Sequence, residues 1–239
     1  HMSPVEIANE IRETVKSEIG LTVSIGVSFN KIFAKLGSDM KKPDAVTEIT
    51  PESFRTQVWP LPASELLYVG RATAEKLRRY GVHTIGDLAQ SDPEYLKRLL
   101  GINGERLWVY ANGLDNSRVM PCDYEPPIKS IGHGITCTSD LLSREEVYHV
   151  LMEVSQEIGL KLRKQRLAAS GVRIYVRDNS LSHQGYQCKL DFPTQSYTII
   201  AKAGFDLFCR RHTWHNDVRS LTISAIDLVP SDCPIQLDM

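Results

Sequence analysis

Four lysines between residues 31 and 42 are the side chains in this sequence with the clearest chemical use. Lys31 and Lys35 lie four residues apart, so both project from one face if the segment is helical. Lys41 and Lys42 follow, and Pro43 disfavours helical geometry at Lys42 and favours an extended backbone there. Ammonium groups are compact point charges that suit an anionic ligand such as a phosphate chain. The alternative is four solvated lysines on a surface helix, which is common in globular proteins.

The residues before the lysines predict the elements that position them. Residues 3–6 read S-P-V-E, a capping box with proline at the first helical position. Apolar residues then recur at every fourth position and predict one apolar helix face: Ile7, Ile11, Val15 and Ile19. Gly20 is suited to end this helix in the left-handed conformation. Residues 21–27 form a short run rich in β-branched side chains, which predicts a strand. Asn30 can cap the helix that carries the first two lysines.

The segment from Ser24 to Pro43 has the pattern S-I-G-V-S-x-N-K-x-x-A-K-x-x-S-x-x-x-K-P. This long and specific pattern resembles the palm segment of the Y-family (translesion) DNA polymerases, above all the bacterial polymerase IV and UmuC-like branch. In that family the lysine before the proline contacts the triphosphate of the incoming nucleotide. The resemblance therefore implies a nucleotide-triphosphate contact for Lys42, and it makes Lys31 and Lys35 candidates to face the phosphates.

The middle of the chain, about residues 60–125, reads as helices separated by glycine turns. A turn at Gly70 leads into a helix, and after Gly81 a short helix follows that Thr84 and Asp87 can cap. This is a helix–hairpin–helix pattern, whose backbone N–H groups suit a phosphate because glycine lets the ligand backbone approach closely. The candidate DNA contacts here are Gly70, Arg71, Thr73 and Lys76.

A second, degenerate copy of the hairpin pattern lies around residues 99–113 and adds Gly101 and Gly104 as candidate DNA contacts. The alternative for both copies is a pair of αα-hairpins that only pack together. In the Y-family this region is the thumb, so the resemblance implies an all-helical thumb over 60–125 after a partial palm over 3–59. The family's first turn usually has a glycine where this chain has Tyr68, which leaves the approach of a phosphate open at that residue.

Residues 128–229 predict the order β-α-β-β-α-β, and therefore an antiparallel sheet with helices on one face. Arg173, Tyr175 and Arg177 alternate along one predicted strand toward a single side, and the face without helices is free for a partner. The order resembles the little-finger domain of the Y-family, and the K-S-I-G at its start matches as well. The resemblance implies template-phosphate contacts for Lys129, Ser130, Gly132 and Arg219, to which the open face adds Arg173 and Arg177. Without the resemblance, this is an α+β domain of open function.

The tail, residues 230–239, ends in Q-L-D-M, which resembles the start of a bacterial sliding-clamp peptide, Q-L-x-L/M-F. The resemblance implies clamp contacts for Gln236, Leu237 and Met239, and it makes a sliding clamp an expected partner. The phenylalanine of that pattern would follow Met239, so we expect the sequence to stop inside the motif. The alternative is a frayed polar terminus.

Composition narrows the class of protein without identifying it. The chain has 28 basic and 29 acidic residues, so it lacks a strongly basic character as a whole. Residues 1–127 carry 15 basic against 17 acidic side chains, whereas residues 128–229 carry 13 against 10, which suits DNA binding by the second part. Five cysteines without paired spacing, no secretory signal and no membrane-length apolar run predict a cytoplasmic protein with reduced thiols. Cys209, His212 and His215 have no clear fourth ligand, so we assign no metal site.

Polymerase chemistry needs carboxylates that hold two metal ions, and the family's carboxylates lie N-terminal to the helix at residues 5–19. No D-x-D and no S-x-D-E on a predicted strand replaces them here. We therefore expect an α+β multidomain C-terminal portion of a translesion DNA polymerase that binds primer–template DNA but is inactive alone. Mg²⁺ and an incoming nucleotide are implied only for the full-length parent. The alternatives are a non-enzymatic helix–hairpin–helix or clamp-tethered repair factor, or a nuclease or glycosylase with such a hairpin.

Overall fold

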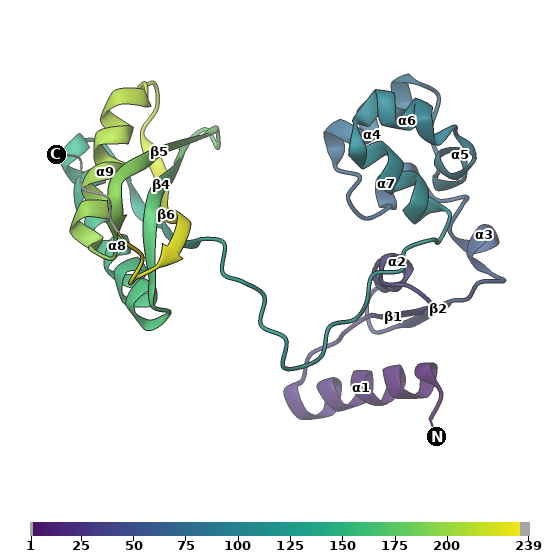
Figure 1. Cartoon of the computed structure of the whole chain (residues 1–239). Helices are drawn as coiled ribbons and strands as arrows, with labels where there is room; N and C mark the ends of the chain where they lie inside the picture. Colours follow the sequence, from purple (N-terminus) through teal and green to yellow (C-terminus); the bar gives the residue numbers. More distant parts are fainter. Residues whose placement is uncertain (1, 235–239) are drawn as a thin grey trace. The chain divides into compact units, whose positions relative to one another are not determined.

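The computed structural model describes residues 2–234, and their contacts divide them into two units, one ending at Tyr124 and one beginning at Glu125. Both units contain helices and strands (Figure 1), which confirms the predicted α+β class. The predicted clamp residues Gln236, Leu237 and Met239 lie outside the described residues. No helix within residues 2–234 has the length and apolar character needed to span a membrane.

The first unit begins with helices that alternate with two short strands. These elements are α1 (Pro4–Ile19), β1 (Ile25–Ser28), α2 (Lys31–Met40), β2 (Val46–Ile49) and α3 (Phe54–Gln57). Strands β1 and β2 pair in parallel, and α2 is the crossover between them. Strand β1 begins later than the predicted strand over residues 21–27, because pairing with β2 starts only at Ile25.

Local side-chain hydrogen bonds set the ends of the helices, as the sequence predicts. Ser3 and Glu6 form the capping box of α1, and Gly20 follows that helix with a φ of 72°. At the start of α2, the Phe33 N–H donates to Asn30 Oδ1 at 2.8 Å. These caps satisfy backbone donors that a helix leaves unpaired in its first turn.

The helices that follow are η1 (Ala63–Glu65), α4 (Arg71–Arg79), α5 (Ile85–Gln90), α6 (Pro93–Leu100) and α7 (Ile102–Ala111). Thr84 and Asp87 form the predicted capping box of α5. A hydrophobic core joins these helices to α2, with Phe33 in the same buried cluster as Leu77 and Leu96. The predicted boundary near residue 60 therefore lies between segments that share a core, and the division into palm and thumb stays a prediction.

The second unit is a four-stranded antiparallel sheet packed against helices. Its elements are β3 (Ile131–Leu141), α8 (Arg144–Lys164), β4 (Leu167–Asp178), β5 (His183–Thr194), α9 (Tyr197–Arg211) and β6 (Val218–Pro230). The strand order is β3-β6-β4-β5, so the last strand of the chain lies inside the sheet. Helices α8 and α9 cover one face of the sheet (Figure 1), and their apolar side chains share a core with the strands.

Gly26 lies where α2 crosses β1 without room for a side chain. A Cβ at this position would overlap with the Ala34 carbonyl oxygen and lie 2.6 Å from the Ser38 amide nitrogen. We expect Gly26→Ala to push the helix from the strand and lower the free energy of unfolding by about 1–3 kcal/mol. Chemical denaturation of the whole chain measures this change.

Gly70→Ala is the matched control for that substitution. A Cβ on Gly70 would meet nothing within 4 Å, and its φ of −74° is ordinary for alanine. We expect a loss of at most about 1 kcal/mol, from the poorer N-cap. Equal losses in the two variants would contradict the close approach at Gly26.

Candidate nucleic-acid and phosphate interface

A hollow of about 380 Å³ beside α2 brings together two of the three predicted phosphate-facing lysines. Asp39 forms ion pairs with both, with Lys35 and with Lys42, whose Nζ lies 2.7 Å from Asp39 Oδ1. The ammonium of Lys35, and then that of Lys42, holds the pKa of Asp39 below its ordinary value. The two lysine side chains remain 52% and 61% exposed, so an anion can reach both. Lys31, at the first position of α2, is exposed and does not line this hollow.

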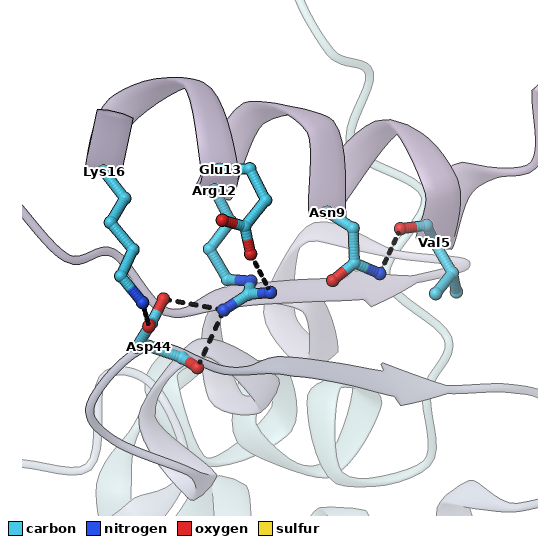
Figure 2. A network of polar contacts seen from close by, with 6 residues as sticks. All are labelled: Val5, Asn9, Arg12, Glu13, Lys16 and Asp44. Atoms are coloured by element: carbon cyan, nitrogen blue, oxygen red, sulfur yellow. Dashed lines mark hydrogen bonds and ion pairs between the residues drawn. The ribbon is translucent and has the colours of Figure 1, made fainter. Parts of the chain in front are cut away.

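Asp44 fixes the chain that follows the lysine pair to helix α1 (Figure 2). Arg12 Nη1 donates to Asp44 Oδ1 at 2.8 Å, and Lys16 Nζ donates to Oδ2 at 2.6 Å. Glu13 accepts from the same guanidinium through Arg12 Nη2. The Lys16 ammonium, followed by the Arg12 guanidinium, lowers the pKa of Asp44. Because Asp44 is two residues after Lys42, these contacts hold one side of the hollow in place.

Polar contacts matter for α1 because its apolar face is open in the described part of the chain. Ile7, Ile11 and Ile19 are 46%, 50% and 65% exposed, while Ala8 is the buried residue of the helix. The packing of α1 against the rest of the first unit therefore removes little apolar area from water. The ion pairs of Asp44 supply the specific part of that contact.

The first hairpin presents an open helix N-terminus. Gly70 is the N-cap of α4, is exposed, and makes no side-chain cap, so backbone N–H groups of the first turn face solvent. Arg71 is exposed and Thr73 is half-buried beside that end. Lys76 is already engaged, because its Nζ donates to the Leu99 carbonyl at 2.6 Å at the end of α6. That contact ties α4 to α6, where a cation suits the helix C-terminus.

Tyr68 adopts a conformation that the sequence pattern does not reveal. Its φ is 71°, in the left-handed region where the family's usual glycine would fit without strain. A bulky residue in that region costs about 1–3 kcal/mol, so the fold keeps the glycine-like path at this turn despite the side chain. Tyr68 thus differs from the pattern in its side chain, whereas its backbone has the conformation that a glycine would adopt.

The second hairpin separates two predicted glycines into different roles. Gly101 joins α6 to α7 with a φ of 67°, is exposed, and has open space around it. Gly104 is buried instead, and a Cβ there would overlap with the Leu96 carbonyl oxygen and lie 3.1 Å from the Lys97 amide nitrogen. This burial argues against the predicted DNA contact of Gly104, because the glycine lets α6 and α7 cross closely and leaves little surface for a ligand.

The open face of the second unit's sheet carries the predicted arginines. Along β4, Val172, Ile174 and Val176 are buried against the helices, so Arg173 and Arg177 project from the opposite face with Tyr175 between them. Arg173 donates to Gln187 Oε1 on β5 through Nε at 3.0 Å and Nη2 at 2.7 Å. The guanidinium is thereby held over the sheet rather than free in solvent.

On β3 and β6, the open face of the sheet carries small side chains. Gly132 on β3 pairs with Ser224 on β6, and Gly134 pairs with Thr222 in the same way. A Cβ on either glycine would overlap with the opposite hydroxyl side chain, so the two strands leave no room for larger groups. The open face, defined here as the outward residues of β3, β6, β4 and β5, therefore combines small residues on β3 and β6 with arginines on β4.

The remaining predicted contacts lie at the edges of the second unit. Lys129 and Ser130 precede β3 and are exposed. Arg219, near the start of β6, forms an ion pair with Asp140 through Nη1 at 2.9 Å, and this hydrogen bond is the main cause that lowers the pKa of the carboxyl. A guanidinium carries five N–H donors, so Arg219 retains donors for a ligand.

Metal-ligating side chains do not gather anywhere in residues 2–234: no group of three His, Cys, Asp or Glu side chains there could hold an ion. His212 stacks on Phe208 with ring centroids 4.8 Å apart, and burial lowers its pKa. His212 directly follows α9 and is half-buried, with its ring packed on that helix.

The sequence did not predict the ion pairs of two acidic residues of the site, Asp39 and Asp44. Asp39 lies four residues after Lys35 and three before Lys42, a helical spacing from which its ion pairs could have been inferred. Asp44 meets Arg12 across 32 residues of sequence, and no local pattern announces that contact.

The chain matches family models at both ends. Residues 128–239 match the model of the impB/mucB/samB family C-terminal domain, and residues 1–39 match that of the impB/mucB/samB family. The chain is 46% identical over 234 residues to DNA polymerase IV of Acetivibrio thermocellus, across 98% of this chain and 59% of that protein. It is 38% identical over 229 residues to DNA polymerase IV 1 of Bacillus subtilis, across 95% of this chain and 55% of that protein. This chain thus spans little more than half the length of these relatives.

A solved structure gives a likeness of fold. It is a Y-family DNA polymerase chimera that matches with a TM-score of 0.76 at 20% sequence identity, over 94% of this chain and 64% of that chain. At this identity the match concerns the fold alone.

The Asp44 network leads to a pH-dependent prediction. Because pairing lowers the pKa of Asp44 from its ordinary 3.8, its contribution to stability is present above that value and is lost as the pH falls through the lowered, folded-state pKa. Residue 44 has a left-handed backbone with a φ of 56°, which asparagine tolerates as aspartate does. We expect Asp44→Asn to lower the melting temperature at pH 7. In strong acid, where Asp44 itself is protonated, the variant and the parent should melt alike.

Thermal unfolding of both chains across this pH range measures the difference, with Glu13→Gln as the control. Glu13 is 60% exposed and pairs only with Arg12 among the described residues, so its substitution should change little. A melting difference for Asp44→Asn that stays constant from neutral pH into acid would refute the role assigned to the carboxylate.

Proposed function

The chain belongs to the Y-family DNA polymerases, in the polymerase IV and UmuC-like branch, and from that premise we propose that it is the part that grips primer–template DNA. In this proposal residues 3–59 are a partial palm, 60–125 a thumb with helix–hairpin–helix motifs, and 128–229 a little-finger domain. The parent protein would use the grip for template-directed nucleotide addition in translesion DNA repair. The alternative of a non-enzymatic repair factor is not favoured, since the similar proteins named above are polymerases.

The observation that carries the proposal is the open face of the second unit. Glycine, serine and threonine line its β3 and β6 strands, two arginines on β4 project from it, and Arg219 lies beside it with further N–H donors. Cations over a low surface of glycine, serine and threonine suit the sugar–phosphate backbone of DNA, which carries a regular row of negative charge. Such contacts position DNA without reading base edges, so a damaged template base would not weaken them.

The first unit adds candidate contacts of the same kind. Gly70 and Gly101 leave open space beside helix ends, with Arg71 and Thr73 next to the first of them. Backbone N–H groups at such an end bind phosphate well. We assign these residues to the grip together with Lys129, Ser130 and Gly132, and we leave out Gly104.

The lysine hollow is the proposed site for a nucleotide's triphosphate. Lys42 and Lys35 line it and pair with Asp39, whereas Lys31, at the start of α2, lies outside it and stays a candidate to face the phosphates. Mg²⁺, which the family implies, finds no cluster of three ligating side chains in residues 2–234, so no metal-dependent step is assigned to them. The clamp contacts proposed for Gln236, Leu237 and Met239 rest on the sequence pattern alone.

Removal of the two β4 arginines tests the grip. We expect the double variant Arg173→Ala, Arg177→Ala to bind duplex DNA more weakly, to the same degree on unrelated sequences, because phosphate contacts carry no sequence information. The slope of log affinity against log salt should fall in magnitude by about two, one for each lost phosphate contact. Fluorescence anisotropy over a salt titration measures both.

The control for this experiment removes equal charge from the covered side of the same unit. Arg144 and Lys164 lie on α8, are exposed, and form no ion pair with a described residue. Their double alanine variant should keep the parent's affinity and slope. A salt-independent affinity of the parent chain would sink the proposed function itself.

The lysine hollow has its own test with inorganic triphosphate. Lys42→Ala should weaken binding, while Asp39→Asn should strengthen it a few-fold, since each exposed ion pair with Asp39 is worth roughly 0.2–1 kcal/mol. Isothermal titration calorimetry at low salt measures the affinities. Lys41→Ala is the control, because Lys41 is the exposed neighbour that forms no ion pair with Asp39; an equal effect there would mean only diffuse attraction.

A further inference from the structure

Two tyrosines form an exposed aromatic surface beside the first hairpin turn. Tyr68 is 71% exposed, and its ring lies against that of the half-buried Tyr110, with centroids 5.8 Å apart and planes tilted by 34°. Tyr110 belongs to α7, so the pair joins the turn before α4 to the second hairpin. Tyr68 combines this exposure with a left-handed backbone, and strained residues of this kind cluster at ligand sites.

The rings border an open hollow of about 370 Å³, within the range of small-ligand sites of about 300–1,000 Å³. Leu107 forms its apolar floor, and Asn103 and Arg106 reach it from the same helix. Neither Asn103 nor Arg106 makes a side-chain hydrogen bond or ion pair with a described residue, and both are exposed. The hollow is thus lined by two tyrosines, by one amide and by a guanidinium that has no partner among the described residues.

This combination suits a nucleotide whose base is not paired. Aromatic faces stack on nucleobases of any sequence, and an arginine beside them binds the adjoining phosphate. In a duplex both faces of each internal base are covered by its neighbours, so the rings gain no stacking there. A single-stranded segment next to a duplex leaves its base faces open.

We propose that Tyr68 and Tyr110 stack on an unpaired nucleobase of the bound DNA, with Arg106 at its phosphate; this inference rests on the proposed function. The left-handed backbone of Tyr68 lets this turn carry a tyrosine ring while the proposed DNA contacts next to it keep their geometry. The turn keeps the path that glycine would take, so the open end of α4 after Gly70 is unaltered.

The test is Tyr68→Gly in the whole chain, which removes the ring and suits the φ of 71°. Two duplexes are compared, one blunt and one with a single-stranded overhang that carries 2-aminopurine, whose fluorescence falls on stacking. We expect the variant to bind the blunt duplex as the parent does, to bind the overhang DNA at least about fivefold more weakly than the parent, and to lose the quenching. Arg106→Ala should weaken overhang binding in the same direction.

Tyr80→Ala is the matched control. Tyr80 is 55% exposed and neighbours another tyrosine, Tyr95, with ring centroids 6.4 Å apart, but it does not line the hollow. It should leave both affinities unchanged. If Tyr68→Gly keeps the parent's overhang affinity and quenching, the stacking site is wrong while the grip stands. If the parent binds neither DNA, both the stacking site and the proposed function fail.

Discussion

Direct contact between backbones, with no Cβ between them, fixes the geometry of the first unit. Gly26 lets α2 lie on β1 through the Ala34 carbonyl, and Gly104 lets α7 lie on α6 through the Leu96 carbonyl. At each crossing a rotation of the helix would bring atoms into overlap, because protein interiors are close-packed. The direction of Lys35 from α2 therefore depends on a residue that has no side chain.

The second unit depends on a different constraint, the alternation of side chains along a strand. Burial of Val172, Ile174 and Val176 against α8 and α9 obliges Arg173 and Arg177 to face away from the core. A one-residue slip in the pairing of β4 would turn the arginines toward the core and expose the buried apolar side chains to solvent. The hydrophobic core thus determines where the cations project, although they contribute nothing to it.

Local chemistry explains which features were predictable. The caps at Ser3, Asn30 and Thr84 depend on residues three positions apart, so the sequence contains all of the information. The contact of Asp44 with Arg12 and the burial of Gly104 depend on how distant segments meet, and no short pattern encodes either. The repeated hairpin pattern suggested that both glycines of the second hairpin face DNA, whereas packing leaves Gly101 open and buries Gly104.

Partners within the chain hold several of the candidate cations in place. Asp39 holds Lys35 and Lys42, Asp140 holds Arg219, and the Gln187 amide holds Arg173, so the cations are oriented before a ligand arrives. An arriving phosphate competes with these partners as well as with water and salt. Each contact is weaker for that competition, but less side-chain entropy is lost on binding. In the proposed function, many modest, pre-oriented contacts to the DNA backbone would let the protein release its template and move along it after each nucleotide addition.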